Sequence, residues 1–169
     1  ADVVASLLKE GDTVWIHDFH LFPLGHELRK LGWKGKIGFF LHTPFPPTEV
    51  FTIMPWAGQL LEMMLDYDLF GVHTRQYLRN LFDSLAGELD GVTIGNTFIS
   101  GGRSLSAGAW PIGIDAEGFR KMAIVRQEST TGSYVHDISP DHQIVLGVDR
   151  LDYTKGIIQR LITFEHLLE

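Results

Sequence analysis

Four short apolar runs are spaced along the chain, and each has the composition of a buried strand. They span residues 14–18, 37–41, 69–72 and 144–148, and β-branched and aromatic side chains dominate them. Nearly every position in these runs is apolar, without the alternation of a half-buried strand. The pattern therefore predicts strands covered on both faces, as in a parallel sheet.

Helical periodicity accounts for much of the chain between these runs. Apolar side chains recur at the 3.6-residue spacing over residues 53–65 and again over 77–85. The first dozen residues resemble the end of an amphipathic helix with a glycine exit, and residues 157–168 predict a further helix. Strands and helices that alternate in this way predict βαβ units in an open α/β sheet.

Changes in composition divide the chain into segments. Residues 91–108 predict a hairpin with a glycine-rich turn that leads into a last strand. Residues 116–141 are polar, so we expect a domain over 1–115, a linker over 116–141 and the start of a second α/β unit over 142–169. The chain opens on alanine rather than methionine and closes inside an amphipathic pattern, and we therefore expect a piece of a longer protein.

Composition excludes several classes of protein. The 169 residues are 44% hydrophobic and 21% charged, which is typical of a globular protein and excludes disordered and coiled-coil chains. Fourteen Lys and Arg against 21 Asp and Glu give a net charge of −7, the wrong sign for binding nucleic acid or an anionic membrane. Cysteine is absent, which excludes disulfides and thiolate metal sites and is compatible with the cytoplasm, where we expect the protein. No apolar stretch approaches the ~20 residues of a membrane span.

Polar side chains follow all four predicted strands. Asp18 and His20 follow the first strand, His42 the second, His73 the third, and a charged stretch over 149–155 the fourth. Ligands of open parallel sheets bind outside the carboxyl ends of the strands, so we interpret these residues as parts of one site.

The loop after the second strand is stiffened by proline. His42 is followed by prolines at positions 44, 46 and 47, which fix the backbone and remove amide donors. Such a rigid loop favours a role in holding a ligand over that of a plain connection. His17 and His20 have opposite parity on a strand, so we do not expect them to form a metal site.

The stretch 147–156 carries the clearest indication of ligand charge. Arg150 and Lys155 lie five residues apart after a buried strand, and a glycine and a predicted helix start follow. A guanidinium fork, an ammonium and free helix amides together suit a phosphate or a diphosphate. The alternative is that both cations pair with Asp149 and Asp152 on the surface, and the spacing alone favours neither interpretation.

Four motifs resemble those of the trehalose-6-phosphate synthases, in their order and spacing. They are WIHDFHL at 15–21, FFLHTPFP at 39–46, PIGID at 111–115 and GVDRLDYTKG at 147–156. The resemblance runs from about residue 12 to the last residue. It implies the B-type glycosyltransferase fold, in which two Rossmann-like domains face each other across a cleft. This chain would supply the back part of the acceptor-side domain and the first βα unit of the nucleotide-sugar domain.

The resemblance also implies a reaction and its residues. Family members transfer glucose from UDP-glucose to glucose 6-phosphate with retention, giving α,α-trehalose 6-phosphate, without a metal or other cofactor, and homo-oligomers are common among them. Asp18 resembles the catalytic carboxylate on the acceptor side, and His42 the histidine that contacts the donor glucose. Arg150 and Lys155 resemble the pair that grips the UDP diphosphate. Phe19 stands beside Asp18 on the acceptor side, where the family usually has tyrosine.

Three alternatives stay open beside this hypothesis. A glucosylglycerol-phosphate synthase or a validoxylamine-phosphate-synthase-like enzyme would share the donor motif and differ at the acceptor. A non-catalytic regulatory subunit would tend to lose the cleft residues, whereas Asp18, His42, Arg150 and Lys155 are all present. We also expect the isolated chain to be inactive, because the later donor-binding residues of the family lie outside it.

Overall fold

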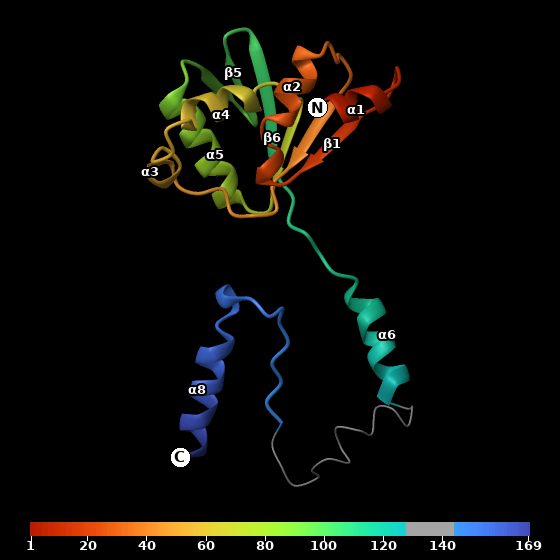
Figure 1. The fold of residues 1–169 in the computed structure, drawn as a ribbon, viewed down its shortest axis with the longest axis vertical. Helices are drawn as coiled ribbons and strands as arrows, with labels where there is room; N and C mark the ends of the chain where they lie inside the picture. The colour runs from red at the N-terminus through yellow and green to blue at the C-terminus, as the bar shows by residue number, and fades with distance from the viewer. Residues whose placement is uncertain (128–143) are drawn as a thin grey trace. The chain divides into compact units, whose positions relative to one another are not determined.

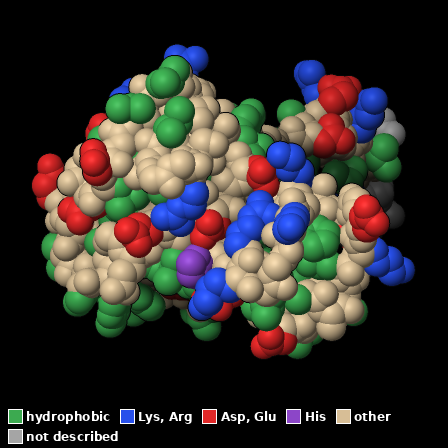
Figure 2. Space-filling view, turned by 90° about the horizontal axis from the view of Figure 1, so that it is seen from above, with side chains coloured by type: hydrophobic (Ala, Val, Ile, Leu, Met, Phe, Trp, Pro, Cys, Tyr) green, Lys and Arg blue, Asp and Glu red, His purple; other side chains and the backbone are tan. Residues whose placement is uncertain are grey.

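The computed structural model describes residues 1–127 and 144–169. They form two compact units, Ala1–Ile114 and Asp115–Glu169 (Figure 1). On the face seen in Figure 2, basic and acidic side chains are interspersed, with hydrophobic side chains between them. In the two described stretches, no helix combines the length and the apolar character that crossing a bilayer requires.

The described residues of the smaller unit, 115–127 and 144–169, form two helices and a short 3-10 turn. Helix α6 spans Ala116–Gln127, the turn η2 spans Tyr153–Lys155, and helix α8 spans Ile157–Leu168. The helix predicted over 157–168 is therefore confirmed. Residues 116–127 of the expected linker are helical, whereas 128–141 lie outside the described residues.

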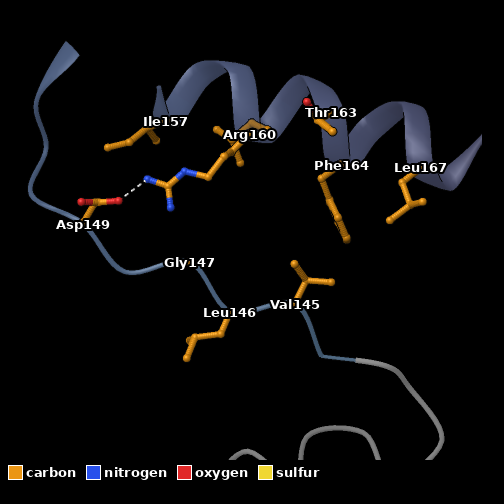
Figure 3. Close-up of a pocket in the computed structure, with 10 residues that line it drawn as sticks. Val145, Leu146, Gly147, Asp149, Ile157, Arg160, Thr163, Phe164 and Leu167 are labelled. Atoms are coloured by element: carbon orange, nitrogen blue, oxygen red, sulfur yellow. Dashed lines mark hydrogen bonds and ion pairs between the residues drawn. The ribbon is translucent and has the colours of Figure 1, made fainter. Parts of the chain in front are cut away.

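The strand predicted over 144–148 is wrong. These residues form no strand, and Ile144, Val145, Leu146 and Val148 are exposed. The physical reason is that a strand needs a hydrogen-bonded neighbour, and the described part of this unit supplies none. Val145 instead points toward Phe164 of α8 across an apolar hollow of about 690 Å³ (Figure 3). Leu161 and Leu167 of α8 are further apolar side chains of its lining.

The larger unit is built on one six-stranded sheet of order β1-β2-β3-β6-β5-β4. Strands β1, β2, β3 and β6 are parallel, whereas β5 and β4 continue the sheet in antiparallel pairing. Their bounds are Val14–His17, Ile37–Phe40 and Leu69–Val72 for β1 to β3, and Val92–Ile94, Thr97–Ser100 and Arg103–Ala109 for β4 to β6. The first three predicted strands and their parallel arrangement are confirmed.

The glycine-rich turn predicted near the end of this sheet is also confirmed. Gly101 and Gly102 both have positive φ and connect β5 to β6. Gly95, with a φ of 60°, lies in the turn between β4 and β5. Glycine adopts this left-handed region without a Cβ clash, so each turn reverses the chain within two residues.

Five helices and one 3-10 turn belong to this unit: α1 Asp2–Leu7, η1 Phe19–Leu21, α2 Leu24–Lys30, α3 Thr48–Phe51, α4 Ala57–Met64 and α5 Arg75–Glu88. The periodic stretches 53–65 and 77–85 correspond to α4 and α5, and the opening amphipathic stretch to α1. Helices α2 and α3 were not predicted, because seven and four residues are too short for a clear 3.6-residue period.

Strand β1 departs from the expectation of cover on both faces. Val14 and Ile16 are buried, whereas Trp15 is 67% exposed and His17 is exposed as well. Successive side chains of a strand point to opposite faces, so β1 presents only one face to the core. The other face carries the side chains of Trp15 and His17, which are exposed. Both are aromatic, so the sequence pattern counted them with the buried positions.

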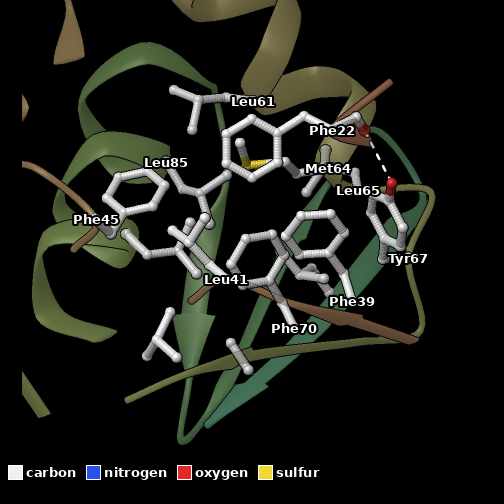
Figure 4. Packing of buried hydrophobic residues seen from close by; sticks show 14 of the residues in the cluster. Phe22, Phe39, Leu41, Phe45, Leu61, Met64, Leu65, Tyr67, Phe70 and Leu85 are labelled. Carbon is white, nitrogen blue, oxygen red and sulfur yellow. Dashed lines mark hydrogen bonds between the residues drawn. The ribbon is translucent and has the colours of Figure 1, made fainter. Parts of the chain in front are cut away.

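An aromatic cluster fills the core on the buried side of the sheet (Figure 4). The ring of Phe39 on β2 lies 4.8 Å from that of Phe70 on β3 and 5.1 Å from that of Phe22. Tyr67, which follows α4, meets Phe39 edge-on at 5.1 Å. Offset and edge-to-face pairs of this kind add about 0.5–1.5 kcal/mol each beyond the burial of area.

Tyr67 ties the segment after β1 to this core. Its side chain is 1% exposed, and its hydroxyl donates to the carbonyl of Phe22 at 2.9 Å and accepts from the amide of Gly25 at 3.0 Å. Burial raises the pKa of Tyr67, so the hydroxyl keeps its proton. A Cβ at residue 25 would lie 2.7 Å from the tyrosine ring, and only glycine allows this approach.

Replacement of Tyr67 by phenylalanine should lower the free energy of unfolding by about 1–3 kcal/mol, because a buried amide and a buried carbonyl lose their partner. Urea denaturation followed by tryptophan fluorescence measures this change. Tyr77→Phe is the matched control, since the half-buried Tyr77 hydroxyl takes part in no hydrogen bond recorded among the described residues. Equal stability of both variants would show that the Tyr67 hydroxyl is not an anchor.

Charged groups fasten α2 to the starts of β2 and β3. Arg29 donates to the carbonyls of Trp33 and Gly35, and its guanidinium lies 3.0 Å from the Asp68 carboxylate. Burial acts to raise the pKa of Asp68, but the amide of Ile37 and the nearby Lys36 and Arg29 outweigh it, so the pKa lies below its ordinary value of 3.8.

Asp68→Asn should therefore remove a pH-dependent part of the stability. The folded pKa is below the unfolded one, so the contribution is complete above the ordinary value of 3.8 and is lost as the pH falls through the lowered one. The difference in unfolding free energy between the native protein and the variant should be constant above about pH 5 and shrink below about pH 4. Urea titrations between about pH 3 and about pH 7 measure it. Asp83→Asn, at an exposed carboxylate, is the matched control.

Candidate functional site

Three parallel strands end side by side and deliver their polar side chains to one edge of the sheet. The register sets His17 opposite Phe40 and Phe40 opposite Gly71. Asp18 follows β1, and His42 and His73 follow β2 and β3 within two residues. The sheet thus places Asp18, His42 and His73 at one edge, whereas His20 lies in η1 and stacks on Phe19.

Asp18 turns the chain sharply where β1 ends. Its φ of 71° and ψ of 159° fall in a region that favours glycine, and no other non-glycine residue of the described ranges has a positive φ. The Asp18 amide donates to the Phe40 carbonyl at 2.9 Å, and its carbonyl accepts from Leu21 at 3.1 Å. The carboxylate itself accepts only a 3.2 Å bond from the amide of Phe19 and is half-buried. It remains available for hydroxyl groups of a ligand.

The strain at residue 18 predicts an unusual order of stability between two variants. Asp18→Gly and Asp18→Ala both remove the carboxylate, but only glycine adopts this backbone without strain. Asp18→Gly should therefore be the more stable variant by about 1 kcal/mol, after the greater entropy of unfolded glycine is subtracted. Urea denaturation of the two variants side by side measures the difference. An alanine variant of equal or higher stability would refute strain at this position.

Three imidazoles form a row along the same edge. Nδ1 of His17 and Nε2 of His42 share a hydrogen bond of 2.9 Å, and the rings of His42 and His73 are 5.7 Å apart. The amide of Ile112 donates to Nδ1 of His73 at 3.2 Å, which requires that nitrogen to be unprotonated. Within residues 1–127 and 144–169, no group of three or more His, Asp or Glu has the arrangement of a metal site.

Phe19 and the proline loop enclose an apolar pocket beside Asp18. Phe19 is 50% exposed, and its ring stacks on that of His20 at 4.1 Å. The pocket measures about 370 Å³, and its lining includes Phe19, Pro44, Phe45, Pro46, Phe51 and Met54. A phenyl ring at position 19 offers this pocket packing area and no hydroxyl.

A side chain of α5 holds the proline loop in place. Asn80 is 7% exposed, and its amide nitrogen donates to the carbonyl of Phe45 at 2.8 Å. Gln76 in turn donates to the Asn80 oxygen at 2.8 Å. This support fixes the backbone just beyond His42, and sequence reasoning missed it. An asparagine inside the apolar stripe 77–85 was the signal that could have revealed it.

In the smaller unit, the carboxylates near Arg150 and Lys155 have other partners. Asp149 pairs with Arg160 of α8 at 2.7 Å. Asp152 accepts from the backbone amide and the hydroxyl of Thr154, both at 2.9 Å. The pKa of Asp152 is lowered by these bonds first, and by the charges of Arg150 and Lys155 to a smaller extent. Among the described residues no ion pair joins Arg150 or Lys155 to either carboxylate, and their charges act on Asp152 only at longer range.

Arg150 and Lys155 are exposed and belong to no ion pair among residues 1–127 and 144–169. Gly156, with a φ of 59°, ends the turn η2 and begins α8, whose first turn receives no side-chain cap. Two cations and the uncapped amides of a twelve-residue helix suit an anionic group. Asp18, Phe19 and His42 belong to the larger unit, and Arg150 and Lys155 to the smaller one.

Comparison with known proteins identifies the family. The family model described as Glycosyltransferase family 20 matches residues 1–169. The chain belongs to glycosyltransferase family 20. This confirms the resemblance carried by the four sequence motifs.

Relatives of this family 20 chain include enzymes of fungi and bacteria. The alpha,alpha-trehalose-phosphate synthase [UDP-forming] of Candida albicans is 40% identical over 174 residues, which cover 98% of this chain and 36% of that protein. The trehalose-6-phosphate synthase of Klebsiella pneumoniae is 36% identical over 170 residues, covering 100% of this chain and 36% of that protein. The chain therefore spans little more than a third of the length of these relatives.

Solved structures share the fold. A trehalose-phosphate synthase of Burkholderia xenovorans in complex with glucose-6-phosphate matches with a TM-score of 0.88 and 34% identity, over 99% of this chain and 38% of that one. The E. coli protein bound with UDP-2-fluoro glucose matches with a TM-score of 0.86 and 34% identity, over 99% of this chain and 37% of that one. The predicted fold class, an α/β part of a B-type glycosyltransferase, is confirmed.

Proposed function

We propose that the protein containing this family 20 chain transfers glucose from UDP-glucose to glucose 6-phosphate, with retention, to give α,α-trehalose 6-phosphate. The observation that carries the proposal is the engagement of Asp149 by Arg160 and of Asp152 by Thr154, which leaves Arg150 and Lys155 beside the start of α8 for an anion. Relatives named as UDP-forming synthases, and related structures that hold glucose-6-phosphate or UDP-2-fluoro glucose, support the same reaction.

Each candidate residue has a role in this reaction. Arg150 and Lys155 bind the diphosphate and neutralise the negative charge that grows on the leaving UDP. His42 contacts the donor glucose. Asp18 binds hydroxyls of the acceptor and stabilises positive charge on the oxocarbenium-like sugar, with Phe19 packing beside it.

Retention needs no nucleophilic carboxylate in a front-face mechanism. The bond from the anomeric carbon to the diphosphate breaks, and the acceptor hydroxyl attacks from the same face. Its proton passes to the departing phosphate oxygen, so no protein base, metal or other cofactor takes part. The protein supplies positioning and electrostatic stabilisation. We place this reaction in the cytoplasm.

The deciding experiment is UDP release by the full-length protein from UDP-glucose. The reaction is run with glucose 6-phosphate, with glycerol 3-phosphate and without acceptor, and the product is identified by mass. Release only with glucose 6-phosphate, giving a disaccharide phosphate, supports the proposal. Release with glycerol 3-phosphate would make the protein a glucosylglycerol-phosphate synthase. Phe19 lies on the acceptor side, where such a change of acceptor would be felt. No release at all would favour a regulatory subunit.

Lys155→Ala should weaken UDP-glucose binding by about 1.5–3 kcal/mol, the range of a hydrogen bond to a charged group. Isothermal titration calorimetry of the full-length protein measures the affinity. Lys121→Ala on α6 is the matched control, because that ammonium lies 3.8 Å from Glu117 on an exposed helix face. Unchanged affinity of the Lys155 variant would remove this residue from the diphosphate site.

A further inference from the structure

His17 lies between two aromatic side chains on the uncovered face of β1. Its ring centroid is 5.0 Å from that of Trp15 and 5.2 Å from that of His42, and it is nearly parallel to the latter, with an interplanar angle of 20°. Nδ1 of His17 bonds Nε2 of His42 at 2.9 Å. The reaction proposed above assigns a role to His42 and none to His17.

Burial does not hold the His42 ring, because both imidazoles are exposed. The rings of Phe40 and His73 border His42 at 5.0 Å and 5.7 Å, and they contribute contact without a hydrogen bond to it. Of the hydrogen bonds described here, the one to His17 alone fixes the rotation of the His42 ring. An exposed side chain without this bond would sample several rotamers.

The bond also couples the protons of the two rings. A hydrogen bond between two imidazole nitrogens needs one N–H and one lone pair, so the tautomer of His17 dictates that of His42. Since Nε2 of His42 is engaged by His17, Nδ1 is the nitrogen that remains for a ligand. Its character as donor or acceptor is then set by His17.

We propose that His17 is a positioning residue that fixes the orientation and the tautomer of the His42 ring for the donor sugar. This inference rests on the proposed function, in which His42 contacts the donor glucose. A side chain that is already held in its binding orientation lowers the activation barrier, because less conformational entropy is lost on reaching the transition state.

Two substitutions at residue 17 separate the hydrogen bond from the ring contact. His17→Phe keeps an aromatic ring between Trp15 and His42 but has no nitrogen for the hydrogen bond. His17→Asn has no ring but places a side-chain amide near the position that Nδ1 of His17 occupies in the native protein. In the full-length enzyme we expect His17→Phe to lower kcat on the order of tenfold, with unchanged affinity for UDP, which lacks the sugar. His17→Asn should restore most of the loss. His166→Phe, at an exposed histidine of α8, should match the native enzyme.

Native kcat in His17→Phe, or equal losses in the Phe and Asn variants, would overturn the proposal. A second readout does not depend on turnover. Long-range ¹H–¹⁵N spectra of the full-length protein should report one tautomer for His42 in the native protein and a mixture in His17→Phe. Unchanged His42 signals would refute the positioning role. Turnover absent in the native enzyme, together with altered His42 signals, would reject the proposed function alone and leave the coupling of His17 to His42 standing.

Discussion

The parallel register of β1 on β2 is the constraint on which the rest of the site depends. It sets His17 opposite Phe40, and the amide of Asp18 then continues the ladder by one bond to the Phe40 carbonyl. A slip of one residue would move every side chain of β1 to the other face. The register therefore decides at once which residues enter the core and which imidazole meets His42.

One face of β1 and β2 packs in the core, and the opposite face carries residues of the candidate site. Ile16 and Phe39 face the aromatic core, and the Tyr67 hydroxyl fastens the segment that follows β1 to that core. The opposite face carries His17, next to a turn in which Asp18 holds a strained backbone. Packing energy on one side can thus support a costly conformation at the edge of the sheet.

Sequence reasoning succeeded where a pattern was long or topology was decisive. Apolar runs located β1 to β3, and periodicity located α5 and α8. The strand-end rule placed Asp18 and His42 at one edge of the sheet, whereas their roles stay a prediction. Helix α2 was too short to show a period. The run 144–148 has the composition of a strand, but composition does not reveal whether a neighbour is present.

Contacts between distant segments were beyond the sequence. The parity of His17 was weighed only against His20 in the same segment, whereas its partner, His42, comes from the next strand. Arg160 binds Asp149 across eleven residues, a pairing that no local spacing indicates. The sequence therefore indicated the residues that carry the proposed chemistry, but it did not indicate the residues that position them through hydrogen bonds and ion pairs.

The apolar run 144–148, which pairs with no strand among the described residues, bears on the aggregation of the chain. Its β-branched, uncharged residues have the composition of segments that pair with copies of themselves in aggregates. Asp149 and Arg150 follow at once, and charges in that position act as gatekeepers against such pairing. Arg150, which is proposed to bind a diphosphate, thus also lies where a charge opposes pairing of this apolar segment with copies of itself.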